Sequence, residues 1–163
     1  MHAVISAELA VFFESGVSVL VGTRDARLFP ECLRAVGARV EPGGDEVTVF
    51  VPKATSAQTV ANLADNRRVA LCFERAADHR SIQVKGTLAA LEDARDADRA
   101  IVDRYVEMIA QEWGFLGLPP RITHRMTHWP CHALRMRVET LFVQTPGPGA
   151  GDPLAPQGAR RAR

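Results

Sequence analysis

The sequence predicts a mainly β domain: an antiparallel barrel or closed sheet of about six strands, with two or three short helices packed at its ends. Several strand-like segments follow one another without a helix between them, which favours antiparallel pairing over a doubly wound parallel sheet. The last segment is the clearest, because Leu134, Met136 and Val138 alternate with charged residues. One face of that strand is therefore buried and the other faces water.

In chain order, the sequence predicts a helix at 6–15, strands at 17–23, 30–41 and 46–52, a helix at 55–66, strands at 68–74 and 80–91, a helix at about 94–113, and the last strand. Ser6 caps the first helix and Gly16 ends it. Gly37 lies inside a predicted strand, where glycine often marks a bulge or a close backbone approach. The turn cluster at 42–45 predicts a hairpin between its flanking strands.

The length and composition of the chain predict one globular domain. The chain has 163 residues, of which 47% are hydrophobic and 24% are charged. We expect a domain over residues 1–144 and a Pro/Gly-rich tail over 145–163, where no periodicity survives. The net charge of +1 gives no strong attraction to nucleic acid or to an anionic membrane.

Cysteine usage and the N-terminus bear on the compartment. The three cysteines are widely separated and lack metal-type spacing, so free thiols in a reducing compartment are expected. Cys72 lies in an apolar run and is expected to be a buried small hydrophobe. Glu8 and Glu14 interrupt the apolar N-terminal stretch, which predicts neither a signal peptide nor a membrane span. A cytoplasmic location is therefore expected.

The start of the second predicted helix is a candidate anion site. Thr55 and Gln58 fit a capping box, with Thr55 as the N-cap. The N–H groups of Ser56 and Ala57 would then be left to meet an anion, and Lys53 adds a full charge from the end of the preceding strand. These groups could hold a phosphate monoester. The alternative is an ordinary capped helix beside a solvated lysine.

A polar row lies on the strand predicted at 80–91. Ser81, Gln83 and Lys85 share one face of that strand, because side chains alternate along it. Three polar side chains in a row can line the heteroatom edge of a cofactor. A plain solvent-facing surface is the other interpretation.

Three segments resemble one family. SVLVGTRDARLFPECLRAVGARV is similar to the opening hairpin of the FMN-binding split barrels of the pyridoxamine 5'-phosphate oxidase-like family. KATSAQTVANLADNRRVALCF looks like the family's helix and following strand, and RSIQVKGTL looks like the next strand, with its glycine at Gly86. The likeness covers roughly residues 5–143. The matching positions are Thr23, Asp25, Pro30, Asn62, Leu63, Asn66, Arg68 and Val69.

The resemblance implies a six-stranded split barrel that forms a homodimer, with FMN bound at the subunit interface. It places the isoalloxazine ring or ribityl chain beside Arg34, Ala35 and Val36. It places the ribityl phosphate beside Pro52, Lys53, Ala54, Thr55, Ser56, Gln58 and Thr59. Ser81 or Gln83 would approach from a neighbouring strand of this subunit or the other, and Lys85 is a further cation.

One departure from the family bears on the cofactor. The family's oxidases usually carry an Arg-Lys pair in the first helical turn, where this chain has Gln58 and Thr59. Each charged hydrogen bond to an anion contributes about 1.5–3 kcal/mol, so a lower affinity for FMN is expected. The same groove could instead hold a deazaflavin. The family's pyridoxal phosphate signature near the C-terminus is absent, so oxidation of vitamin B6 is not expected.

The expected function is that of an FMN-dependent oxidoreductase acting on an unidentified small molecule with a nicotinamide or similar electron donor. The sequence contains no acid, base or nucleophile constellation, so it assigns no catalytic residue. The alternative is a protein that is not an enzyme: a module that binds or stores a flavin without turnover.

A histidine cluster supports a third interpretation. His124, His128 and His132 are spaced four residues apart beside Cys131, and imidazole and thiolate are good ligands for zinc or haem. Pro130 argues against a continuous helix through them. The favoured interpretation is a loop that covers the barrel's end or the dimer seam, without a metal. A haem-binding split barrel remains the alternative.

Overall fold

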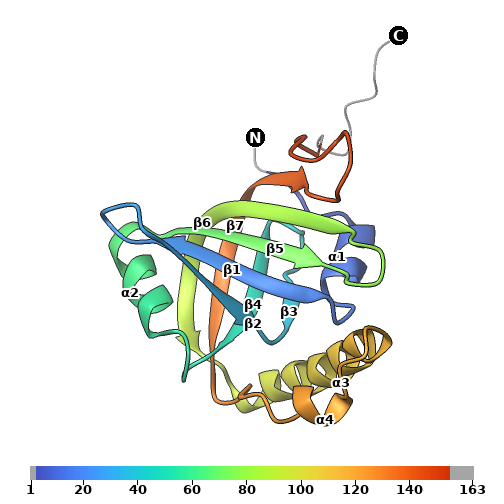
Figure 1. Cartoon of the computed structure of the whole chain (residues 1–163). Coiled ribbons are helices and arrows are strands. Elements are labelled where there is room, and N and C mark those ends of the chain that lie inside the picture. Colours follow the sequence, from blue (N-terminus) through green and yellow to red (C-terminus); the bar gives the residue numbers. More distant parts are fainter. Residues whose placement is uncertain (1–2, 155–163) are drawn as a thin grey trace.

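The computed structural model of this chain describes residues 3–154 and shows a curled antiparallel sheet with short helices around it (Figure 1). The strands are β1 (Ser18–Arg24), β2 (Pro30–Ala35), β3 (Ala38–Val40), β4 (Glu46–Pro52), β5 (Arg68–Glu74), β6 (Ser81–Asp93) and β7 (Cys131–Val143). Their order across the sheet is β2-β1-β5-β6-β7-β4-β3. The predicted class, a mainly β split barrel, is confirmed.

The sheet has seven strands, one more than predicted. The extra strand arises because the segment predicted as one strand at 30–41 divides at Gly37, whose φ of 146° is open to glycine but not to most residues. The first part, β2, pairs with β1, whereas β3 pairs with β4. The predicted hairpin with 46–52 is therefore made by the second part alone.

The long strands β6 and β7 pair along most of their length and carry much of the sheet's curvature. Their register shifts between Lys85 and Gly86, which marks a β-bulge. A Cβ atom at Gly86 would overlap the carbonyl oxygen of Arg137 on β7. Only glycine lets the two backbones approach this closely at the bend.

The helices are α1 (Ala7–Phe13), α2 (Ala57–Asn66), the short 3-10 helix η1 (Asp96–Asp98), α3 (Arg99–Phe115) and α4 (Pro120–Thr123). In Figure 1, α2 lies at one side of the barrel, and α3 and α4 lie together beneath it. Ser6 caps α1 as predicted. The third predicted helix begins later than position 94, because η1 precedes it.

The core fills the inside of the curled sheet. Leu134, Met136 and Val138 are completely buried, which confirms the alternation predicted for the last strand. Phe13 anchors α1 to this core by stacking on Phe73 of β5, with ring centroids 3.9 Å apart. The prediction for Cys72 was wrong: it is partly exposed on the outer face of β5.

The start of the predicted tail folds back onto the sheet. Phe142 forms a bridge with Pro153, and the N–H of Leu154 donates to the carbonyl of Leu141 at 2.8 Å. Residues 145–154 are therefore docked rather than extended, and the rest of the predicted tail lies outside the described residues.

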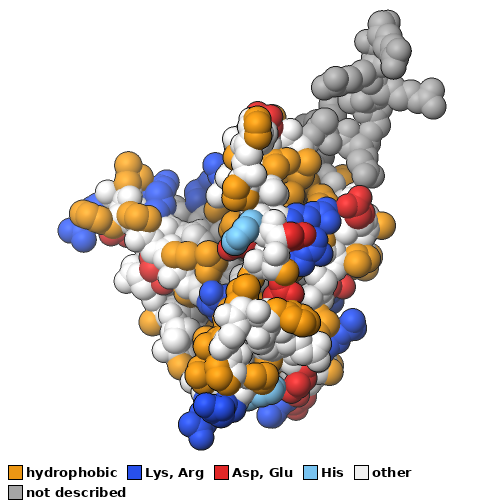
Figure 2. Space-filling model, turned by 45° about the vertical axis from the view of Figure 1, so that its right-hand side comes forward, with side chains coloured by type: hydrophobic (Ala, Val, Ile, Leu, Met, Phe, Trp, Pro, Cys, Tyr) orange, Lys and Arg blue, Asp and Glu red, His pale blue; other side chains and the backbone are white. Residues whose placement is uncertain are grey.

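The surface carries hydrophobic side chains at the lower end of the molecule, over the helical part (Figure 2). Phe115 and Leu116, where α3 ends, are among the most exposed apolar residues, at 84% and 60%. Between residues 3 and 154, no helix is both long enough and apolar enough to span a bilayer.

Candidate functional site

The start of α2 differs from the capping box that the sequence predicts. Ser56, not Thr55, is the N-cap, and the helix begins at Ala57. Pro52 ends β4, and the N–H of Thr55 closes a turn onto its carbonyl oxygen at 3.1 Å. The side chain of Gln58 donates to Asn62 at 2.8 Å instead of reaching back to the cap. The turn uses the residue that was predicted to cap the helix.

Ser56 occupies the N-cap position without capping. Its φ and ψ of −103° and 8° are not extended, and its side chain makes no cap hydrogen bond. The hydroxyl oxygen is fully buried and finds no hydrogen-bond partner within the described part of the chain. The first main-chain donor of the helix is the N–H of Val60, which bonds the Ser56 carbonyl at 2.9 Å. The N–H groups before it are those that every helix start leaves without an internal acceptor.

Lys53 lies in the turn before α2 and forms an ion pair. Its Nζ is 2.6 Å from a carboxylate oxygen of Asp93, at the end of β6. The pKa of Asp93 is lowered, chiefly because Lys53 donates this hydrogen bond. The Asp93 side chain is 72% exposed. Exposed pairs of this kind contribute little to stability, so the Lys53 ammonium can turn toward another anion at small cost.

A carboxylate lies against the first turn of α2, and sequence reasoning missed it. Glu31 of β2 accepts a hydrogen bond from the Thr23 hydroxyl at 2.9 Å and another from the Thr59 hydroxyl. Asn62 donates to the same Thr23 oxygen at 3.0 Å. A signal was available, because strand alternation places Glu31 on the same face as the buried Leu33 and therefore toward the interior.

Arg34 and Ala35 end β2 and Val36 follows it, and the Arg34 side chain extends toward α3. Its guanidinium lies 4.6 Å from the ring centre of Trp113 on α3. The N–H of Val36 bonds the carbonyl of Phe50 at 2.8 Å, which ties this segment to β4. Contact of these residues with a cofactor ring stays a prediction.

Ser81, Gln83 and Lys85 lie at the opposite end of β6 from Asp93. The Ser81 hydroxyl donates to a main-chain carbonyl, Gln83 accepts from Gln144, and the Lys85 ammonium lies 4.9 Å from the ring centre of Phe142. One copy of the chain therefore does not bring this polar row to the start of α2.

Lys85 borders a shallow cleft of about 400 Å³ on the outer face of β1, β5 and β6. Small residues and three basic side chains line it. Its lining consists of Gly22, Thr23, Arg24, Arg68, Val69, Ala70 and Lys85.

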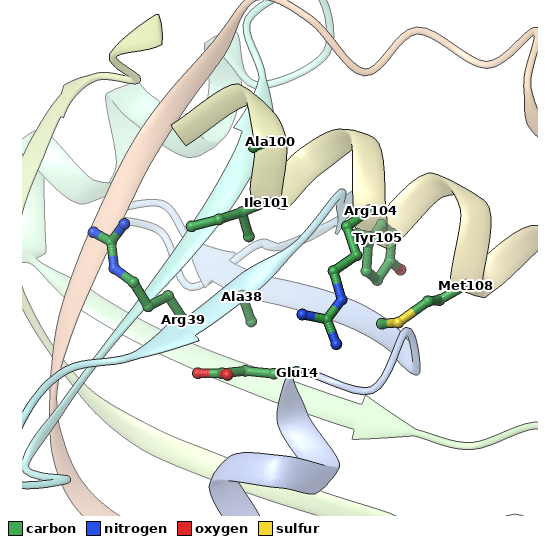
Figure 3. A pocket seen from close by; sticks show the side chains of 8 residues that line it. All are labelled: Glu14, Ala38, Arg39, Ala100, Ile101, Arg104, Tyr105 and Met108. Carbon is green, nitrogen blue, oxygen red and sulfur yellow. The ribbon is translucent and has the colours of Figure 1, made fainter. Parts of the chain in front are cut away.

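A second cleft, of about 350 Å³, lies between α1, β3 and α3 (Figure 3). The side chains of Arg104 and Glu14 reach into it from opposite sides, over apolar walls that include Ile101 and Met108. Residues 52–59 line neither this cleft nor the one on the outer face of the sheet. A ring pocket beside α2 therefore needs walls that these monomer clefts do not supply.

The three histidines do not converge. His124 pairs with Glu107 at 3.0 Å, whereas His132 lies in β7 and faces Asp93 at 3.4 Å. Burial lowers the pKa of His128 and raises the pKa of the Cys131 thiol to about 12, which keeps that sulfur protonated. Within the described ranges, no three His, Cys, Asp or Glu residues group as metal ligands.

The curled antiparallel sheet with short helices around it defines the class: a split barrel. The chain belongs to the pyridoxamine 5'-phosphate oxidase family, whose model matches residues 5–141. The matched residues agree with the range of roughly 5–143 over which the sequence analysis finds a resemblance to the family. No curated protein matches the chain.

Solved structures share the fold. The HupZ protein of Group A Streptococcus is 19% identical, with a TM-score of 0.57 over 90% of this chain and 99% of that one. A putative pyridoxamine 5'-phosphate oxidase from Lactobacillus delbrueckii is 13% identical, with a TM-score of 0.55 over 86% and 94% of the two chains. An FMN-binding protein from Syntrophomonas wolfei is 14% identical, with a TM-score of 0.51 over 82% and 81%.

Proposed function

We propose that this protein binds FMN, with the ribityl phosphate at the start of α2, and that it acts as an FMN-dependent oxidoreductase on a small molecule. The observation that carries the proposal is the Ser56 hydroxyl, which is fully buried at an N-cap and finds no partner among residues 3–154. A buried polar group without a partner costs about 1–3 kcal/mol. A phosphate oxygen would remove that cost.

The surroundings of Ser56 suit a phosphate. The first amides of α2 lack acceptors within the helix, and the helix dipole adds partial positive charge at this end. Lys53 sits three residues before the N-cap and holds only an exposed partner, Asp93. The residues present therefore fit a phosphate monoester, although two cations of the family's pattern are missing at Gln58 and Thr59.

The flavin ring would lie where two copies of the chain meet. The residues that line the cleft on the outer face of the sheet include Gly22, Ala70, Arg24 and Lys85. No helix of the described chain lines this cleft. A second copy of the chain packed on this face would supply the missing walls, so a homodimer is part of this proposal.

When bound, a flavin would supply hydride transfer, and this chain's residues would hold and orient it. A nicotinamide or similar donor is the expected source of electrons. No residue of this chain is assigned as a catalytic acid or base. The three cysteines are free, which supports the expected reducing, cytoplasmic compartment.

The test compares FMN with riboflavin, which has the same ring but no phosphate. Lys53→Ala should weaken FMN about tenfold and leave riboflavin unchanged, because one charged contact to the phosphate is lost. Arg121→Ala, an exposed cation on α4, is the control and should change neither affinity. Equal loss of both ligands would contradict the phosphate role of Lys53, and failure to bind either flavin would end the proposal.

Two further measurements separate the alternatives. Reduction of the bound flavin by NADH or NADPH supports an enzyme, whereas stable binding without reduction supports a flavin-storing module. Binding of a deazaflavin in preference to FMN would reassign the cofactor, and a Soret band in the purified protein would point to haem.

A further inference from the structure

We propose that the negative charge of Glu31 repels the phosphate group of FMN at this site. FMN and riboflavin therefore bind with similar affinity. This inference rests on the proposed flavin site. It concerns one acidic side chain, Glu31, which the sequence analysis does not name as a site residue.

The position of the carboxylate follows from its hydrogen bonds. One oxygen of Glu31 accepts from the hydroxyl of Thr59, the third residue of α2. A threonine hydroxyl is two bonds from its own Cα, so the carboxylate lies beside the first helical turn. The amides of that turn are the donors proposed for the phosphate.

The carboxylate is held in this position. Thr59 is completely buried, and Thr23, which donates to the same Glu31 oxygen, is 7% exposed. Asn62, 2% exposed, donates in turn to the Thr23 hydroxyl. Packed partners on both β1 and α2 therefore stop Glu31 from swinging aside when a ligand arrives.

The same network occupies the two positions where the family usually carries Arg and Lys. The Thr59 hydroxyl is committed to Glu31, and the Gln58 amide is committed to Asn62. The Thr59 hydroxyl cannot donate to a phosphate without breaking its bond to Glu31, and the Gln58 amide has only one N–H left, without a positive charge. The first turn thus lacks two cations and has gained an anion next to it.

The charges then work against each other. A carboxylate near a helix start already benefits from the helix dipole that a phosphate would use. A phosphate monoester carries about −1.5 to −2 charge at neutral pH, and like charges at this range repel one another. Attraction from Lys53 and the amides is therefore offset by repulsion from Glu31, and the phosphate adds little net affinity.

The experiment measures dissociation constants of FMN and riboflavin for the full chain and for Glu31→Gln. The substitution keeps the shape and an oxygen that accepts from Thr23 and Thr59, but removes the charge. We expect FMN to bind on the order of tenfold more tightly and riboflavin to be unchanged. Glu41→Gln is the matched control, because Glu41 also accepts a threonine hydroxyl, that of Thr48 at 2.6 Å, on the turn after β3.

Each outcome supports or contradicts the proposed role of Glu31. A gain for FMN alone, absent from Glu41→Gln, supports the role of Glu31. Equal changes for both flavins, or no change, would overturn it while leaving the flavin site intact. The wild-type chain gives a test that needs no variant: FMN binding a hundredfold tighter than riboflavin would overturn the inference. Binding of neither flavin by any of these proteins would instead remove the proposed function.

Discussion

Two helices of this chain start with a serine, and only one of those serines caps its helix. Ser6 has extended backbone angles, and its hydroxyl accepts from the N–H of Leu9 at 3.2 Å. Ser56 holds the same position in α2, but its hydroxyl is buried and accepts nothing from the described residues. The Ser6 hydroxyl therefore caps α1, whereas the Ser56 hydroxyl at the start of α2 has no hydrogen-bond partner within residues 3–154.

The difference comes from how the chain enters each helix. The chain before α1 is extended, with a ψ of 161° at Ser6 that aims the side chain at the third helical residue. A tight turn after Pro52 leads into α2, and Ser56 has a ψ of 8°. From that conformation the hydroxyl does not reach the helix amides. The same residue at the same helix position therefore caps α1 but does not cap α2.

The largest expected effects test whether α2 is as firmly anchored as α1. Phe13 and Leu63 are both completely buried. Phe13→Ala should lower the free energy of unfolding by about 3–5 kcal/mol, and Leu63→Ala by about 2–5 kcal/mol. Urea denaturation of the flavin-free protein measures both. A loss below about 1 kcal/mol for Leu63→Ala would show a loosely held α2, and its open start would then reflect a weak helix.

The next effect sharpens the contrast between the two helix starts. Gln58→Arg places a cation at the second residue of α2 and should tighten FMN binding by about 1.5–3 kcal/mol, without changing riboflavin. Ala7→Arg places the same cation in the first turn of the capped helix α1 and should have no effect on either flavin. Isothermal titration measures all four affinities. A gain from Ala7→Arg would show a general charge effect instead of a phosphate site.

Removing each serine hydroxyl compares the two directly. Ser6→Ala should cost about 1 kcal/mol of unfolding free energy, because it removes a working cap. Ser56→Ala should raise the free energy of unfolding of the flavin-free protein by about 1–3 kcal/mol, because it removes a buried hydroxyl that has no hydrogen-bond partner among residues 3–154. It should still weaken FMN relative to riboflavin. Equal destabilisation by the two changes would mean that Ser56 caps α2 in solution.

The smallest effect concerns the Lys53–Asp93 pair. Lys53 lowers the folded-state pKa of Asp93 below its unfolded value of about 3.9. The pair's contribution is therefore fully present above that value and is lost as the pH falls through the lowered folded pKa. Asp93→Asn should remove the pair's share of the pH dependence of the free energy of unfolding, which unfolding curves between about pH 5 and 2 measure. The substitution should also slightly tighten FMN binding, because it releases the Lys53 ammonium. An unchanged acid profile would show that the pair is not formed in solution.

The local parts of the structure could be predicted from the sequence. The Ser6 cap and the alternating face of β7 follow from neighbouring residues, and the predicted strand at 68–74 has the bounds of β5. The break at Gly37 was only suggested, because a glycine in a strand does not say whether the chain bulges or changes partner.

The features that decide the candidate site depend on contacts between distant residues. Glu31 and Thr59 are 28 positions apart, and only the register of β2 on β1 and the placement of α2 bring them together. The Thr55 capping box failed for a related reason. Thr55 could either close the turn after Pro52 or cap α2, and local propensity does not decide between these two positions.

The docked segment after β7 has a practical consequence for purification. The Leu154-to-Leu141 hydrogen bond and the Phe142–Pro153 bridge hold this segment against the end of β7. An affinity tag fused directly after Gln144 would remove the segment and leave the main-chain groups of Leu141 and Val143 without these partners. A tag fused beyond Leu154 keeps the segment, and is the safer choice for every titration described above.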